Sequence, residues 1–164
     1  DRFGVSHRMD YYTIENLMDI VLRGAEILGA KTENDGAFEI AKRSRGTPRI
    51  ANRFLKRVRD YSEIRGKGII TQDIAMEALA LLGVDELGLD ELDREILNGI
   101  IENYNGGPVG VETMSLLLGE DRRTLEEVYE PYLVKIGFLK RTHRGRMVTE
   151  KGYLHIGKEI TVKE

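Results

Sequence analysis

Apolar residues recur every three or four positions through most of the chain, which is the spacing of one face of an α-helix. Residues that start or stop helices, chiefly Thr, Asp, Pro and Gly, stand between these stretches. In the first half the pattern predicts four helices that pack as one small bundle. The expected helices cover residues 13–28, 32–44 (starting at Thr32 or Asn34), 48–64 and 71–82. Ahead of them, Val5 to Tyr12 is expected to be a short strand or an extended lead-in.

A short acidic segment, residues 84–89, is the expected boundary between two domains. Beyond it the pattern predicts three helices, then two strands joined by a tight turn, and a last short helix. The helices are expected at residues 90–103, 112–118, 122–136 and 150–156, and the strands at 138–141 and 146–149, with a further two- or three-residue strand at 109–111. Pro131 should kink the third helix or shift its start. Three helices followed by a β-hairpin predict a winged helix-turn-helix.

Composition fits a mainly helical globular protein, because 41% of the 164 residues are apolar and 32% are charged. No apolar run approaches the length of a membrane span, and no secretory signal is visible. The absence of cysteine excludes disulfides and thiolate chemistry and fits a reducing compartment, so we expect a cytoplasmic protein. The chain begins at Asp1 in what reads as the middle of an element, and we expect it to be part of a longer protein.

Charge is unevenly distributed although the net charge is only −3. Residues 1–83 carry 14 basic and 12 acidic side chains, whereas residues 84–164 carry 11 and 16. Two segments are nevertheless locally basic: residues 39–67, with 10 Lys/Arg against 3 Asp/Glu, and residues 135–151, with 6 Lys/Arg. Local patches decide polyanion binding more than the total does.

Cations crowd the predicted hairpin and the helix before it. The hairpin holds Arg141, His143, Arg144 and Arg146, and the helix begins with Arg122 and Arg123. A thin basic hairpin is suited to lie along phosphates or in a minor groove. The same helix carries Glu126, Glu127 and Glu130, which phosphate would repel. We therefore expect DNA contact through shape and backbone, not base reading; a solvated hairpin on a protein-interaction domain is the alternative.

The tract Arg45-Gly46-Thr47-Pro48-Arg49 opens the third predicted helix of the first half. Thr47 has the chemistry of an N-cap and Pro48 that of a first helical residue. Arg49 then lies in the first turn, where the helix dipole disfavours a cation. Backbone N–H groups and a guanidinium aimed together form a phosphate receptor. An arginine that simply points into water remains the alternative.

Other kinds of site find little support. His7, His143 and His155 are far apart and lack metal-ligand spacing, so no metal site is expected. The chain has neither a G-x-x-x-x-G-K-[ST] phosphate loop nor a recognisable Ser/His/Asp signature. By itself the chain is expected to be catalytically inactive and to bind no cofactor.

Several tracts together resemble the RuvB family of bacterial Holliday-junction branch-migration motors, and the resemblance covers nearly the whole chain. The tracts are residues 2–4 (RFG), 45–53 (RGTPRIANR), 106–110 (GGPVG), 130–133 (EPYL), 137–139 (GFL) and 144–146 (RGR). The resemblance implies a four-helix AAA+ lid at residues 13–83 and a winged-helix DNA-binding domain at 84–164. Residues 1–12 would be the end of the large AAA+ domain, whose Walker A and B segments this chain does not contain.

The family pattern implies individual roles. Arg49 matches the sensor-2 arginine that reaches from the lid, beside Pro48, to ATP on the large domain. Arg2 matches an arginine finger acting in trans on a neighbouring subunit's nucleotide. Tyr12 lies where the chain would pass from the large domain to the lid, and the family pattern places it near the nucleotide that Arg49 contacts. Mg²⁺ would be held by the large domain.

For DNA binding, Arg122, Arg141 and Arg146 match family positions that contact DNA, and Arg144 joins them by charge. His143 occupies a wing position that is often proline in the family, which implies a more flexible tip.

As a whole, the resemblance implies a homohexameric, ATP-driven helicase that moves Holliday-junction DNA in recombination, repair and the SOS response, with RuvA and RuvC as partners. In it, Arg49 would report the presence of the γ-phosphate, the lid would rotate, and the hexameric ring would convert that rotation into duplex translocation. Two other hypotheses remain: a non-enzymatic winged-helix regulator that dimerises through its first domain, and a protein-interaction module.

Overall fold

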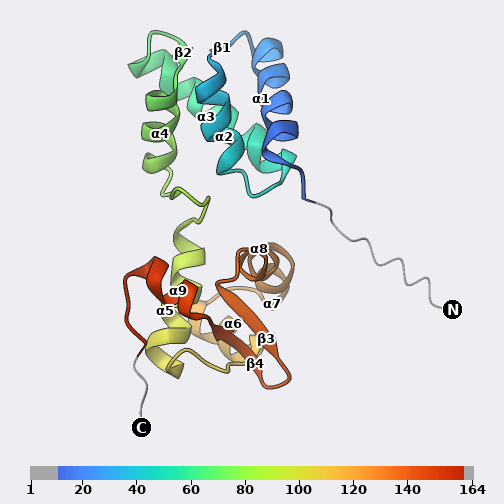
Figure 1. Cartoon of the computed structure of the whole chain (residues 1–164), viewed down its shortest axis with the longest axis vertical. Helices are drawn as coiled ribbons and strands as arrows, with labels where there is room; N and C mark the ends of the chain where they lie inside the picture. The colour runs from blue at the N-terminus through green and yellow to red at the C-terminus, as the bar shows by residue number, and fades with distance from the viewer. Residues whose placement is uncertain (1–10, 161–164) are drawn as a thin grey trace, which may run out of the picture. The chain divides into compact units, whose positions relative to one another are not determined.

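The computed structural model describes residues 11–160, which form two compact units that divide between Leu89 and Asp90 (Figure 1). Each unit has its own elements and is described by itself. Most of the lead-in expected at Val5 to Tyr12, and Arg2 with it, lies outside the described residues. Tyr11 and Tyr12, the described end of that segment, are not in a strand.

The first unit is a bundle of four helices, as the periodicity predicted. They are α1 (Ile14–Leu28), α2 (Asn34–Lys42), α3 (Pro48–Arg65) and α4 (Gln72–Leu81). The capping residues explain where they begin and end. The hydroxyl of Thr13 accepts a hydrogen bond from the N–H of Asn16, that of Thr71 accepts from Ile74, and Gly29 ends α1 in the left-handed conformation.

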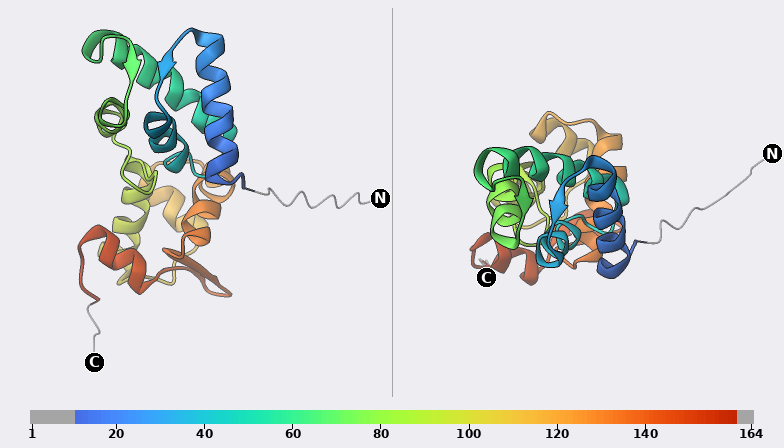
Figure 2. Two further views of the ribbon diagram at one scale, coloured as in Figure 1. Left: turned by 45° about the horizontal axis from the view of Figure 1, so that its top comes forward. Right: turned by 90° about the horizontal axis from the view of Figure 1, so that it is seen from above.

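A pair of two-residue parallel strands, β1 (Lys31–Thr32) and β2 (Ile69–Ile70), was not predicted. The two strands lie side by side at the end of the bundle in both views of Figure 2. They are too short to show the alternation that marks a strand. Gly36 explains how α2 starts against them: a Cβ atom there would lie 2.6 Å from the carbonyl oxygen of Ile70.

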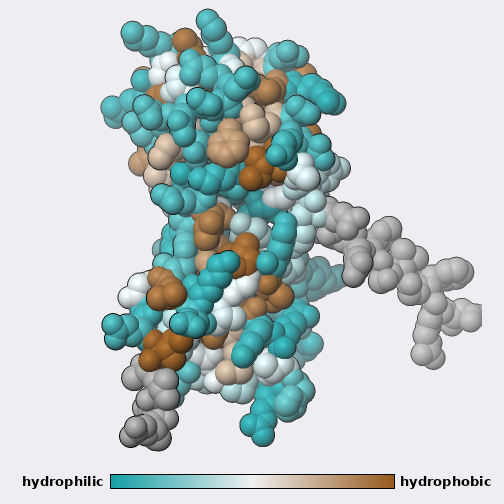
Figure 3. All heavy atoms as spheres, viewed as in Figure 1, coloured by the Kyte–Doolittle hydropathy of each residue, from teal (hydrophilic) through white to brown (hydrophobic). Residues whose placement is uncertain are grey.

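The core of the first unit is formed by one apolar face from each helix together with β2. Its buried side chains include Leu17, Ile40, Phe54, Leu55, Val58, Ile70 and Leu79. Hydrophilic side chains cover most of the face of this unit that is visible in Figure 3. A buried ion pair joins α2 to the residue that follows it, with Arg43 Nε 3.2 Å from Glu39 Oε2. Arg43 Nη1 also donates to the carbonyl of Val84, at 3.4 Å, and so ties the segment after α4 to α2.

The second unit contains the expected helices and hairpin, with one interruption. Its elements are α5 (Glu91–Tyr104), α6 (Val111–Leu118), α7 (Arg122–Thr124), a π-helical turn η1 (Leu125–Tyr129), α8 (Glu130–Lys135), β3 (Leu139–Thr142), β4 (Gly145–Val148) and α9 (Glu150–Ile156). Asp90 caps α5 in a reciprocal capping box with Asp93. The strand expected at residues 109–111 is only an isolated bridge between Val109 and Arg146, because Gly110 already caps α6.

Pro131 does distort the helix expected at 122–136, as a π-helical turn. The N–H of Glu130 donates to the carbonyl of Leu125, five residues back. Proline has no N–H, and its ring collides with the carbonyl four residues earlier in a regular helix. The wider turn relieves that collision, and such turns recur at functional sites.

The hairpin packs tightly where it approaches the loop before α6. Gly145 has φ 136°, and a Cβ atom there would lie 2.4 Å from the carbonyl oxygen of Val109. Only glycine permits both the conformation and the approach. Within residues 11–160, no helix has the length and apolar character needed to cross a bilayer, and no cluster of His, Asp and Glu is arranged to hold a metal ion.

Candidate nucleic-acid interface and phosphate-facing turn

Arg141 and Arg146 lie directly opposite each other on the antiparallel pair β3–β4. Because side chains alternate along a strand, they share a face with Leu139 and Val148, which are buried. That face is turned toward the helix containing Glu130. The Arg146 side chain is accordingly only 14% exposed, whereas that of Arg141, nearer the edge, is 54% exposed.

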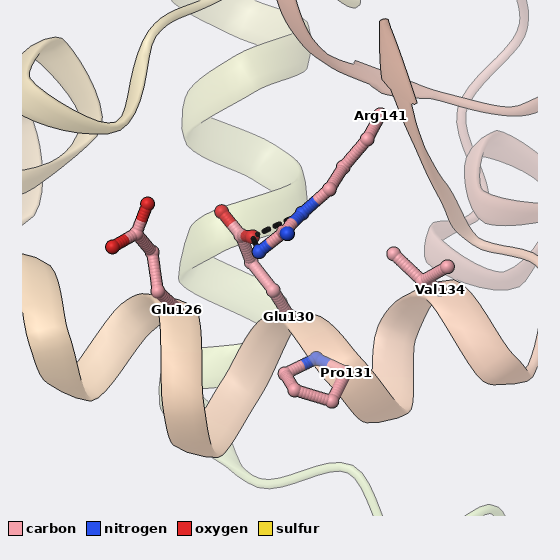
Figure 4. A pocket seen from close by; sticks show the side chains of 5 residues that line it. All are labelled: Glu126, Glu130, Pro131, Val134 and Arg141. Atoms are coloured by element: carbon pink, nitrogen blue, oxygen red, sulfur yellow. Dashed lines mark hydrogen bonds and ion pairs between the residues drawn. The ribbon is translucent and has the colours of Figure 1, made fainter. Parts of the chain in front are cut away.

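Glu130 joins the two arginines. Its carboxylate is 1% exposed, and Arg141 donates to its Oε2 atom through both Nε, at 2.9 Å, and Nη2 (Figure 4). Arg146 donates to the other oxygen, Oε1, through Nε at 2.5 Å, and to Oε2 through Nη2 at 3.3 Å. Glu130, Pro131 and Val134 line a hollow beside the hairpin, into which Arg141 reaches.

Glu126 extends this ionic cluster toward Arg122. Arg146 Nη2 donates to Glu126 Oε1 at 3.1 Å, and Arg122 Nε donates to Glu126 Oε2 at 3.3 Å. Arg122 also pairs with Glu112 on α6. Desolvation acts to raise the pKa of Glu126, but the hydrogen bonds and charges of Arg122 and Arg146 outweigh it and lower that pKa. For Arg146, desolvation acts to lower the pKa, and Glu130 and Glu126 reverse this to a net rise.

The cations expected to contact DNA therefore fall into two groups. Arg122, Arg141 and Arg146 are held by glutamates, whereas Arg144, at the two-residue tip, has no side-chain partner within residues 11–160. Lys140 is likewise exposed, on the outer face of β3. The structure thus brings three of the four predicted arginines into one cluster and leaves the fourth open to solvent.

Sequence reasoning missed the role of the glutamates. By charge alone the sequence predicts that Glu126 and Glu130 repel phosphate, whereas in the structure they are counter-ions of the arginines. The i,i+4 spacing of Arg122 with Glu126, and of Arg123 with Glu127, was a visible signal for part of this. The contacts of Glu130 with the hairpin had no such signal, because they join residues 11 and 16 positions apart.

In the first unit, the turn before α3 gathers the other predicted site residues. The N–H of Tyr12 donates to the carbonyl of Gly46 at 2.9 Å, and a Cβ atom at Gly46 would lie 2.7 Å from Cβ of Tyr11. This hydrogen bond ties Tyr12 to Gly46, which precedes Pro48, the first residue of α3, by two positions. Arg49 is exposed in the first turn and makes no ion pair within the described part of the chain.

Thr47 departs from the expectation. It lies at the N-cap position, but its side chain accepts no hydrogen bond from α3; its hydroxyl instead donates to the carbonyl of Arg45, at 3.3 Å. The first N–H groups of an 18-residue helix are thus left without a side-chain cap, next to an exposed guanidinium. This arrangement suits a phosphate oxygen, because both kinds of donor favour an anion.

Models of two protein domains match the chain in sequence. The RuvB AAA lid domain matches residues 12–85, and the RuvB C-terminal winged helix domain matches residues 86–157. The chain belongs to the RuvB family. The sequence is 69% identical, over 99% of its length, to the Holliday junction branch migration complex subunit RuvB of Fusobacterium nucleatum, and 58% identical over 96% to that of Nostoc punctiforme.

Comparison with solved structures gives the same family. The Holliday junction branch migration motor RuvB of Thermotoga maritima superposes with a TM-score of 0.89 at 49% identity, over 93% of this chain and 51% of that one. The chain likewise spans about half the length of the curated RuvB relatives it matches, 49% and 43%. The mainly helical architecture of a RuvB lid and a winged helix is therefore confirmed, while the roles of individual site residues stay predictions.

Proposed function

We propose that this chain forms the lid and the DNA-binding winged helix of an ATP-driven motor that moves Holliday junctions. The observation that carries the proposal is the match of both units, in order, to the two RuvB domain models. Relatives at 69% and 58% identity bear the name of a branch-migration subunit. Catalysis would require the large ATPase domain, which would also hold Mg²⁺.

In the lid, Arg49 would contact the phosphates of ATP bound on the large domain. Its exposed guanidinium next to the uncapped start of α3 supports this role, because both present donors to an anion. Tyr12 and Pro48 would lie at the same edge of the nucleotide, which fits the hydrogen bond between Tyr12 and Gly46. Arg2, outside the described residues, would serve as the arginine finger toward a neighbouring subunit.

In the winged helix, the hairpin and the start of α7 would contact the phosphate backbone. Arg144 would contact it from the tip, together with Arg122, Arg141 and Arg146. Contacts to phosphate position a protein on DNA without reading the sequence, as a motor that passes over every sequence requires.

The motor would act as a homohexamer with RuvA and RuvC on Holliday-junction or duplex DNA, in the cytoplasm, where the bacterial chromosome lies. These assembly and partner assignments rest on the family resemblance.

The test is DNA binding by the chain itself, measured by fluorescence anisotropy with a labelled duplex and a labelled four-way junction at about 50 and about 200 mM salt. We expect binding that weakens steeply with salt. Arg141→Ala with Arg146→Ala should weaken it about tenfold for unrelated sequences alike.

Loss confined to one sequence would instead show base reading. Undetectable binding even at low salt would favour a protein-interaction module and overturn the DNA-binding part of the proposal.

A further inference from the structure

Two like charges face each other on the hairpin. Arg141 and Arg146 are direct cross-strand partners, an arrangement in which like charges repel and destabilise the strand pair. Both side chains reach the same carboxylate, that of Glu130, which is 1% exposed. The buried carboxylate of Glu130 on α8 therefore offsets the repulsion between the two arginines on this face.

Glu130 also fixes the direction of Arg141. Arg141 donates to a single oxygen, Oε2, through Nε and Nη2, which are the two groups on one edge of the guanidinium fork. Its Nη1 group makes no hydrogen bond within residues 11–160, and half the side chain is exposed. One edge of the fork is thus bonded to Glu130, and the opposite edge has no hydrogen-bond partner among residues 11–160 on a side chain that is half exposed.

The other oxygen of Glu130 is held in turn by Arg146, which is mostly buried and also bonds Glu126. The carboxylate consequently has little freedom to rotate. Glu130 is the first residue of α8, directly after the π-helical turn and before Pro131. The distorted helix therefore places a fixed anion under the hairpin.

We propose that Glu130 is a positioning residue for DNA binding: it holds the Arg141 guanidinium so that its free edge faces the phosphate backbone. This inference rests on the proposed function. Glu130 itself makes no contact with DNA in this scheme. It acts by sparing Arg141 the loss of side-chain freedom that an unrestrained arginine undergoes on binding.

The proposal predicts the opposite of simple electrostatics. Removing a negative charge near a polyanion strengthens binding if only net charge matters. If Glu130 orients Arg141, neutralising it weakens binding although the chain becomes more positive. The sign of the change therefore separates the two accounts.

The experiment compares Glu130→Gln with Glu127→Gln in the full 164-residue chain, using the labelled duplex and four-way junction. Both substitutions change the net charge equally, and Glu127 pairs only with the exposed Arg123 among the described residues. We expect Glu130→Gln to weaken binding about five- to tenfold and to reduce the slope of log K against log salt by about 1. Glu127→Gln should leave affinity unchanged or slightly higher. Binding by Glu130→Gln as tight as by Glu127→Gln would overturn the inference and leave the proposed function standing.

A second variant guards against a Glu130→Gln protein that fails to fold, which thermal unfolding would reveal. Arg141→Lys keeps the charge and sits at a half-exposed position, but lysine has no fork to be oriented by one carboxylate. We expect it to bind DNA nearly as weakly as Arg141→Ala. Wild-type affinity in Arg141→Lys would overturn the inference. No DNA binding by the wild-type chain would overturn the proposed DNA contact as well.

Discussion

At the scale of the residue, the Arg49 side chain makes no polar contact among the described residues that would explain its position by the stability of its own unit. It is exposed and makes no ion pair in the part of the chain that the structure describes. A cation in the first turn of a helix is slightly unfavourable, so the fold does not explain its presence there. The proposed contact with a phosphate on another domain would explain it.

Arg49→Ala should therefore leave stability unchanged and impair chemistry. In a RuvB protein that carries this lid joined to its ATPase domain, we expect junction-stimulated ATP turnover to fall about 100-fold or more, as when one preorganised donor is removed. The control is Lys56→Ala, an exposed cation two turns along α3, which should retain activity. Normal ATP turnover with normal branch migration in Arg49→Ala would refute the sensor role.

Gly145 is the residue on which the geometry of the hairpin depends most directly. Gly145→Ala would force an unfavourable φ and push a methyl group into the carbonyl of Val109. We expect a loss of about 2–4 kcal/mol in the free energy of unfolding, measured with urea. Gly110→Ala is the matched control, because no atom lies within 4 Å of its added Cβ, and it should cost about 1 kcal/mol at most. Equal losses in the two variants would show that the approach to Val109 is not the cause.

At the scale of the element, the sequence predicted the helices, whose limits depend on residues close together in the chain. Periodicity located α1, α5 and α9 nearly to the residue, and the expected caps Thr13 and Asp90 do bond the first turns of α1 and α5. Thr149, expected at the end of a strand, instead caps α9. The strands β1 and β2 escaped prediction, since two residues carry no periodicity and their pairing joins positions 38 apart.

The candidate site shows the same limit. The cations of the hairpin could be located from composition, and so could the Arg49 tract. Their partners could not, because Glu130 reaches Arg141 and Arg146 only after the π-helical turn and the hairpin have packed together. Residues that look repulsive in a sequence can therefore be the ones that hold a basic surface in place.

The ion pairs of Glu126 should make the second unit sensitive to acid. The pKa of Glu126 is lower in the folded protein than its ordinary value of 4.5, so the unfolded chain takes up a proton more readily. Stability from this group is therefore fully present above about pH 4.5 and is lost as pH falls through the lowered pKa. We expect the melting temperature of the wild-type chain to fall more steeply between pH 5 and pH 3 than that of Glu126→Gln.

Hydrogen exchange would locate this effect, because it reports on each unit separately. Acid should lower protection first in residues 122–148, where Arg122 and Arg146 lose their ion pairs with Glu126. Parallel melting curves for wild type and Glu126→Gln would show that the pairs do not contribute to stability.

At the scale of the whole molecule, the proposed function requires a chain with net negative charge to bind DNA, which is itself a polyanion. The net charge is −3, and the half that carries the hairpin is the more acidic. Long-range attraction to DNA is therefore weak, and affinity must come from contacts within about 10 Å, the range that salt leaves unscreened. Glu126 and Glu130, which contact the hairpin arginines, are already paired, which lowers their repulsion at that range.

Local control of binding can be separated from net charge by two charge reversals. Arg144→Glu and Lys31→Glu change the net charge equally, but Arg144 is at the hairpin tip and Lys31 is an exposed residue of β1 in the first unit. We expect Arg144→Glu to weaken duplex binding about tenfold at low salt, because it removes one phosphate contact and adds repulsion. Lys31→Glu should change affinity less than twofold once salt exceeds about 0.1 M, because Lys31 makes none of the proposed phosphate contacts and salt weakens the effect of net charge alone. If both reversals weakened binding equally, the total charge and not the hairpin would govern affinity, and the assignment of the wing as the DNA contact would be lost.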